Sequence, residues 1–132
     1  MVKISELKPG NLVVVEYEDR RWEGIVTDVN REDKEVGVDT GVQEFWFRPE
    51  HVYPVPMSDA ALFKLGFSKE FLENGMVKYI RGPFRMLVKD DGKFAPLEIW
   101  YREDRRYFNE PIYIHDLQNK YLEMTKVDLN LV

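Results

Sequence analysis

Residues 110–126 read Glu-Pro-Ile-Tyr-Ile-His-Asp-Leu-Gln-Asn-Lys-Tyr-Leu-Glu-Met-Thr-Lys, and their spacing predicts a short helix over residues 112–125. Pro111 stands at the helix entry, where the backbone N–H that proline lacks would have no partner anyway. Apolar side chains then recur at the spacing of one buried helical stripe: Ile114, Leu117, Tyr121, and Leu122 or Thr125. We expect this stripe to close a sheet formed by the strands that precede it.

Residues 57–132 predict an α+β subdomain. Ser58 can cap a helix over about 58–65, and Gly66 can take the left-handed conformation that ends it. Residues 76–108 return to the alternating pattern of antiparallel strands, with Asp91-Gly92 as a hairpin turn. We therefore expect an antiparallel sheet covered by the C-terminal helix, followed by a final strand or tail.

Residues 1–56 predict a separate, all-β domain. Five short β patterns alternate with turns, and proline near the last of them is tolerated on an edge strand. Gly24 falls inside the second pattern, where it indicates a bulge or sharp bend. Five short strands at this spacing suggest a small SH3-like β-barrel, so the fold class of the whole chain is α+β.

Composition excludes several classes of function. The chain has no cysteine, which excludes disulfides, thiolate metal ligands and a cysteine nucleophile. Its first residues lack the apolar run of a signal peptide, and no window is apolar enough to cross a membrane. Neither phosphate-binding glycine loops nor the G-x-S-x-G elbow occur. We expect a soluble cytoplasmic protein without a cofactor or metal and without membrane contact.

Charge is unevenly distributed along the chain. Residues 1–56 carry 7 Lys and Arg against 12 Asp and Glu, whereas residues 57–132 carry 12 of each. Because nucleic acid binds clustered cations, the first part repels it on average. Nucleic acid is therefore an unlikely partner, although the second part holds one basic cluster at Arg102, Arg105 and Arg106.

Four blocks of the sequence carry a family resemblance: Leu-Lys-Pro-Gly-Asn-Leu (7–12), Val-Tyr-Pro-Val-Pro-Met-Ser (52–58), Leu-Phe-Lys-Leu-Gly-Phe (62–67) and Ile-Tyr-Ile-His-Asp-Leu-Gln-Asn-Lys-Tyr-Leu (112–122). In this order they resemble a family of small proteins, uncharacterised in activity, from Bacteroidetes-type gut bacteria, their prophages and mobile elements. The last block is the most specific, with a VHQLQNLYFALTG-like family pattern. This chain has Asp116 where that pattern has glutamine, and Lys126 where it has glycine. The resemblance implies a lineage and carries no catalytic residue to transfer.

The polar run His115, Gln118 and Asn119 has two interpretations. Beside Asp116, the imidazole of His115 could serve as a base or a metal ligand. However, successive helical residues do not face each other, so we expect the two side chains to point apart. We favour a structural cluster that hydrogen-bonds the adjoining strand or caps helix ends. A metal-dependent hydrolase or nuclease using Asp90, Glu98 and His115 remains a remote alternative.

Aromatic residues give the strongest indication of binding. Tyr17, Trp22 and Trp46 belong to the acidic first domain, and on its strand Trp46 points away from Phe45 and Phe47. These rings either meet the second subdomain or bind a peptide or cation. We therefore expect a non-enzymatic protein-interaction module, with an unknown protein or peptide partner.

The basic cluster supplies the alternative function. Arg102, Arg105 and Arg106 have Tyr101, Tyr107 and Phe108 as neighbours in the sequence. Cations interleaved with aromatic rings suit single-stranded nucleic acid, since bases stack on the rings.

Overall fold

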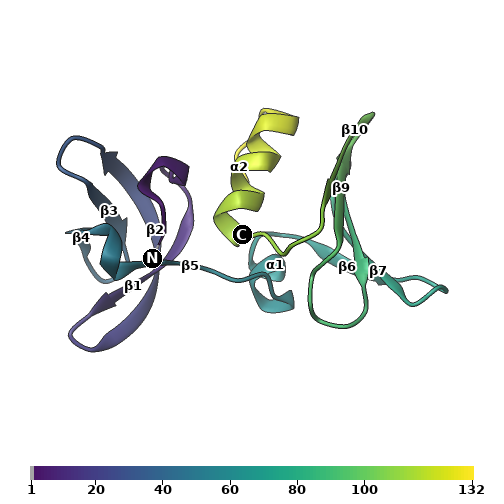
Figure 1. Ribbon diagram of the computed structural model, residues 1–132, viewed down its shortest axis with the longest axis horizontal. Coiled ribbons are helices and arrows are strands. Elements are labelled where there is room, and N and C mark those ends of the chain that lie inside the picture. The colour runs from purple at the N-terminus through teal and green to yellow at the C-terminus, as the bar shows by residue number, and fades with distance from the viewer. Residues whose placement is uncertain (1) are drawn as a thin grey trace. The chain divides into compact units, whose positions relative to one another are not determined.

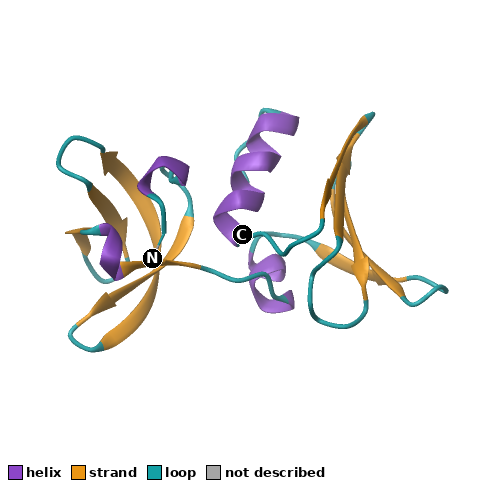
Figure 2. Ribbon diagram, in the orientation of Figure 1, coloured by secondary structure: helices purple, strands orange, loops and turns teal. Residues whose placement is uncertain are grey.

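The computed structural model describes residues 2–132, which form two five-stranded antiparallel sheets and two α-helices (Figures 1 and 2). The protein is therefore of mixed α and β structure. Its contacts divide it into two compact units, Met1–Pro56 with Tyr113–Asn119 and Met57–Ile112 with Lys120–Val132. Within residues 2–132, no helix is both long and apolar enough to cross a membrane.

The sheet of the first unit has the strand order β4-β3-β2-β1-β5. Two short 3-10 helices accompany it, η1 (Ile4–Glu6) and η2 (Pro49–His51). Among residues 2–132 no ladder joins β4 to β5, so the sheet is open and the closed barrel expected from the sequence is not confirmed. Its strands are β1 (Leu12–Tyr17), β2 (Arg20–Asn30), β3 (Glu35–Asp39), β4 (Glu44–Phe47) and β5 (Val52–Pro54).

One face of this sheet forms the core of the first unit. β-Branched residues at alternate positions stack on that face, among them Val13, Val15, Val36 and Val38, and each is fully buried. Their burial is the main stabilising contribution to the unit, because a buried valine contributes about 1.5–3 kcal/mol.

Gly24 has a different role from the one its position in β2 suggested. Its pairing with β1 is regular, and the irregularity of β2 lies between Val26 and Asp28. The bulge expected at Gly24 is therefore wrong. A Cβ at Gly24 would collide with the Val38 side chain and lie 3.0 Å from the carbonyl oxygen of Asp39. Close approach of the neighbouring strand β3 explains the glycine.

The second unit holds a meander in the strand order β10-β9-β8-β7-β6, together with helix α1 (Asp59–Lys64). Ser58 caps α1 by accepting a hydrogen bond from the Ala61 N–H at 3.1 Å, and Gly66 follows the helix at φ +87°. The strands are β6 (Ser68–Phe71), β7 (Met76–Arg81), β8 (Phe84–Lys89), β9 (Leu97–Tyr101) and β10 (Asp104–Phe108). Strand β6 precedes the region in which the sequence predicted strands.

Helix α2 (Ile114–Thr125) contributes to both units. Ile114 and Leu117 are buried and belong to the first unit, whereas Tyr121 belongs to the second and packs on Phe84 with 4.8 Å between ring centroids. The apolar stripe that the sequence predicted as the cover of one sheet is thus divided between two cores.

The chain leaves α2 through a non-glycine residue. Lys126 takes φ +64°, and its N–H donates to the carbonyl oxygen of Leu122 at 2.8 Å. The helix therefore ends where the family pattern has glycine, with lysine in the left-handed conformation. The tail beyond forms no strand, but Leu129 is buried and the Val132 N–H donates to the carbonyl oxygen of Lys64 at 2.8 Å.

Candidate functional site

The polar run of α2 binds the chain that leads into β1. Gln118 accepts a hydrogen bond from the Leu12 N–H at 2.8 Å and donates to the carbonyl oxygen of Gly10 at 2.9 Å. Asn119 donates to the carbonyl oxygen of Glu6 at 2.7 Å and accepts from the Asn11 side chain at 2.9 Å. Three of these four bonds satisfy backbone groups in the segment before β1 and at its first residue, in addition to the pairing of Leu12 with Ile25 in β2.

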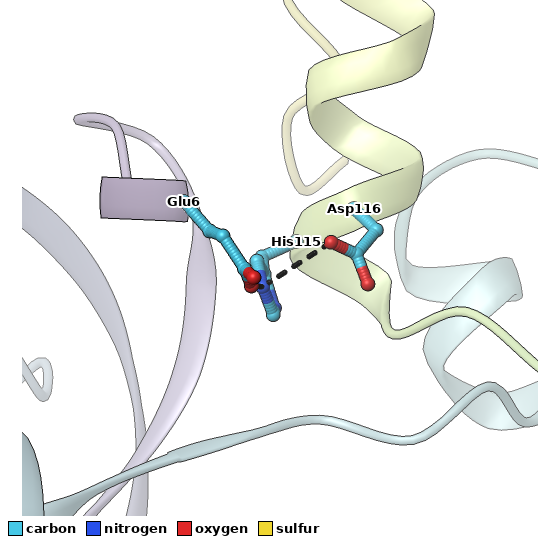
Figure 3. Close-up of side chains that lie close together, drawn as sticks. All are labelled: Glu6, His115 and Asp116. Carbon is cyan, nitrogen blue, oxygen red and sulfur yellow. Dashed lines mark hydrogen bonds and ion pairs between the residues drawn. The ribbon is translucent and has the colours of Figure 1, made fainter. Parts of the chain in front are cut away.

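His115 is 1% exposed and faces two carboxylates. Its Nε2 lies 3.2 Å from Oε2 of Glu6, on η1, and 3.5 Å from Oδ1 of Asp116; Figure 3 shows both carboxyl groups directed toward the imidazole. The expectation that His115 and Asp116 point apart is therefore wrong. Side chains lean toward the N-terminal end of a helix, and there Asp116 also accepts from the Tyr113 N–H at 3.0 Å.

This cluster has the residue types of a metal site, but His115 lacks the hydrogen-bond partner on Nδ1 that a metal-bound imidazole usually has. Glu6, His115 and Asp116 each offer a ligand atom within 4.8 Å of the others. A metal on Nε2 would place the imidazole proton on Nδ1, which is buried and has no hydrogen-bond partner. With the proton on Nε2 instead, the imidazole donates to the carboxylates and needs no ion. The cluster therefore fits a hydrogen-bonded role better than a metal site.

The arginines of the predicted basic patch lie on or beside β10, and two of the three are ion-paired. Nη1 of Arg105 lies 2.6 Å from Oε1 of Glu98. Nη2 of Arg106 lies 3.2 Å from Oδ2 of Asp104, and its Nη1 lies 2.9 Å from Oε2 of Glu123. The hydrogen bonds that Arg106 donates to Asp104 and Glu123 raise its pKa above the usual value. Arg102 lies over the Tyr101 ring, 5.0 Å from its centroid.

The residues of the remote hydrolase alternative have separate surroundings. Glu98 pairs with Arg105, while Asp90 lines a pocket of the second unit, and His115 belongs to the first unit.

That pocket of the second unit contains a polar group that sequence reasoning missed. The Tyr79 hydroxyl donates to Asp59, and Lys69 Nζ lies 2.9 Å from the same carboxylate. The hydrogen bonds from Tyr79 and Lys69 lower the pKa of Asp59, while burial and the bond to Asp59 raise that of Tyr79. These residues lie ten and twenty positions apart in the sequence, and no local pattern indicates that they meet.

The first unit holds an aromatic hollow of about 120 Å³. Alternation places Val13, Val15 and Tyr17 on one face of β1, and Trp22 pairs directly with Val15. Burial falls along this face, from fully buried Val15 to Tyr17 at 45% and Trp22 at 40% exposure. The aromatic hollow is therefore the open end of the core, lined by Val15, Tyr17, Glu18, Trp22, Thr40, Val42, Gln43, Phe45 and Phe47.

Two turns complete the aromatic hollow. The β1–β2 turn places Glu18 at φ +52° and Asp19 at φ +61°, a conformation that usually takes asparagine and glycine. The β3–β4 turn uses Gly41 at φ +88°, whose N–H donates to Oδ1 of Asp39 at 2.8 Å. These positive φ values shape the turn and do not by themselves mark a site, because the same conformation occurs at Lys34, Phe94, Arg102 and Lys126.

The predicted aromatic residues thus separate. Tyr17 and Trp22 line the aromatic hollow together with Phe45. Trp46 does not line the hollow, is 50% exposed, and lines a neighbouring surface depression that also includes Tyr17, Glu18 and Phe45. The alternation of β1 and β4 was the sequence signal that could have grouped Phe45 with Tyr17.

The polar side chains of these sites are arranged in two ways. The clusters at His115 and at Asp59 are internally bonded, whereas the aromatic hollow presents half-exposed rings and a carboxylate to solvent. Comparisons with protein-family models, curated proteins and solved structures find no match to this chain, so the site's own geometry carries the functional argument.

Proposed function

We propose that this protein is a non-enzymatic interaction module whose first unit binds a segment of a partner protein at the aromatic hollow. The observation that carries the proposal is the convergence of Tyr17, Trp22 and Phe45 on one hollow beside Glu18. Exposed aromatic rings supply large contact area with few rotatable bonds, which is why they dominate protein–protein contacts. We also propose that the protein acts in the cytoplasm. The family resemblance is the basis for proposing a phage or mobile-element context.

The fold of the first unit supports this proposal. Its strand order places β5 beside β1, and the 3-10 helix η2 leads from β4 into β5. We therefore propose an SH3-like sheet, whose open end between the first and third turns is a surface available for a peptide.

Charge indicates what kind of peptide would bind. Residues 1–56 carry five more acidic than basic side chains, since 12 minus 7 is 5. Glu18 lines the aromatic hollow, and among residues 2–132 it has no cationic partner. A basic segment is therefore favoured over an acidic one.

Selection from a random peptide library displayed on phage tests the proposal. The full chain is immobilised, and the enriched peptides are then titrated against the native protein and Trp22→Ala. We expect enriched peptides to contain basic residues and to lose at least about tenfold in affinity with Trp22→Ala, because a central aromatic residue typically contributes more than 1.4 kcal/mol.

Trp46→Ala is the matched control. It removes the same side chain from the same unit, at similar exposure, outside the aromatic hollow. If the enriched peptides bind the two variants equally, the aromatic hollow is not the binding site and the proposal fails.

Single-stranded nucleic acid is the alternative ligand. The observation in its favour is the stacking of Arg102 on Tyr101 and of Arg105 on Trp100, at 5.0 and 5.2 Å from the ring centroids. The carboxylates paired with Arg105 and Arg106 weaken this alternative, because a phosphate would have to displace them. Filter binding of an oligonucleotide near 50 mM salt tests it: absence of retention removes the alternative.

A further inference from the structure

We infer that the aromatic hollow receives an alkylated ammonium group, and that its occupant is a trimethylated lysine side chain of the partner protein. The inference rests on the proposed function and specifies the chemistry of the same site.

The first argument is the arrangement of rings and charge. Tyr17, Trp22 and Phe45 line the hollow from three strands. The ring centroids of Tyr17 and Phe45 are 5.3 Å apart with 32° between the ring planes, so these two rings pack on each other and form one wall of the hollow. Ring faces attract cations through their quadrupole, and several rings together form the cage that binds quaternary ammonium groups. Glu18 adds a full negative charge to the same lining.

These rings are available to a cation from outside. Within residues 2–132, cations of the chain lie over Tyr53, Phe71, Tyr79, Tyr101, Trp100 and Phe108, and over no ring of the aromatic hollow. Arg21 lies in β2 next to Trp22 and points to the opposite face of the strand. There its guanidinium covers the ring of Tyr53, 4.4 Å from the centroid, and leaves the ring of Trp22 uncovered.

The second argument distinguishes an alkylated ammonium from a bare one. A lysine ammonium carries three N–H donors and is strongly hydrated, so entering a mostly apolar hollow costs it those hydrogen bonds. The carbonyl oxygen of Gln43 is already bonded to the N–H and hydroxyl of Thr40. Trimethylation removes the donors and keeps the charge, which matches a lining of rings with one carboxylate.

Size is consistent with this occupant. About 120 Å³ is well below the ~300–1,000 Å³ of typical clefts for small molecules, so the hollow suits one side-chain head group. The half-exposed rings leave the mouth open to a side chain that arrives from a polypeptide.

The test compares four probes that differ in one property each. The full chain is titrated by calorimetry with short amide-capped peptides containing trimethyllysine, unmodified lysine, or the neutral tert-butyl isostere of trimethyllysine, and with free choline. We expect the trimethyllysine peptide to bind about tenfold more tightly than the lysine peptide and the neutral isostere, in line with the strength of desolvated cation–π contacts.

Three variants then locate the binding. Trp22→Ala is expected to abolish measurable binding of the trimethyllysine peptide, and Glu18→Gln to weaken it about threefold to tenfold while leaving the rings in place. Trp46→Ala is expected to bind as the native protein does. Thermal melts of each variant show whether it folds.

The outcomes separate this inference from the proposed function. If the isostere or the lysine peptide binds as tightly as trimethyllysine, or if Glu18→Gln changes nothing, the alkylammonium inference is overturned, while Trp22-dependent library peptides would leave the interaction module standing. If choline binds as tightly as the trimethyllysine peptide and no library peptide depends on Trp22, the cation chemistry stands and the protein-binding function falls.

Discussion

The two units of this protein both contain a five-stranded antiparallel sheet, but they differ in how their polar side chains are satisfied. In the second unit, Arg105, Arg106, Lys69 and Asp59 all have charged partners within about 3 Å. In the first unit, Glu18 stands unpaired among residues 2–132 beside the half-exposed rings of Tyr17 and Trp22 and the partly buried ring of Phe45. The comparison teaches that a cluster of charges indicates a binding surface only when its charges are not already neutralised by neighbours.

The largest expected effect concerns the link between α2 and β1 in the first unit. Gln118→Ala leaves the Leu12 N–H and the Gly10 carbonyl without the side chain that satisfies them, and we expect a loss of about 2–4 kcal/mol in the free energy of unfolding. Urea unfolding measures it. Asn119→Ala is the control and should cost less, because its bond to Glu6 is exposed; equal losses would contradict the ranking.

The next effect tests the internally paired cluster of the second unit. Tyr79→Phe removes the hydroxyl bonded to Asp59, and we expect a loss of about 1–2 kcal/mol measured by urea unfolding at neutral pH. Lys69→Met, which removes a partly buried ion pair to the same carboxylate, is the comparison and should cost no more than about 1 kcal/mol.

The same pair predicts a pH dependence with two arms. The folded-state pKa of Asp59 is lowered, so its contribution is present above the ordinary value of 3.8 and is lost on acidification through the folded pKa. The folded-state pKa of Tyr79 is raised, so its contribution is present below the ordinary value of 10.0 and is lost as pH rises above it. Melting temperatures recorded against pH should show both arms. Tyr79→Phe should remove the alkaline arm; an unchanged alkaline arm would contradict the assignment.

A smaller effect, of opposite sign, tests the strained turn of the first unit. Asp19→Gly relieves a positive φ and is expected to stabilise the protein by about 1 kcal/mol. Because Glu18 is retained, binding at the aromatic hollow should persist. Thermal unfolding and peptide titration measure the two properties, and destabilisation would show that Asp19 makes a compensating contact.

The smallest effect concerns the end of α2. Lys126→Gly should stabilise the protein by about 0.5–1 kcal/mol, since glycine takes φ +64° without steric cost. Lys120→Gly, inside the same helix, is the matched control and should destabilise by about 1 kcal/mol. Stabilisation by both would mean that the effect does not arise from the left-handed conformation.

Much of the local structure was predictable because its causes are local. The serine cap and glycine stop of α1 and the alternation of β1 each act through neighbours within four residues. The start of α2 was predicted too early, because the helix begins at Ile114 and Pro111 lies before its first turn. The division of the apolar stripe of α2 was not predictable, because the period of a helix says which residues are buried and not which core buries them.

The candidate site divides in the same way. The types and periodicity of the aromatic residues indicated Tyr17 and Trp22 as binding candidates. The excess of acidic residues in 1–56 indicated a negatively charged domain around them. Strand alternation set Trp46 opposite Phe45 and Phe47, but only the tertiary structure brought Phe45 and Glu18 to the hollow of Tyr17 and Trp22. Only the tertiary structure paired Glu6 with His115 across 109 positions of the chain. Strand pairing and ion pairing between distant segments depend on three-dimensional contacts that leave no periodic trace in the sequence. The amino-acid sequence by itself therefore determined the elements and their buried faces, while the fold decided which side chains remain free to bind.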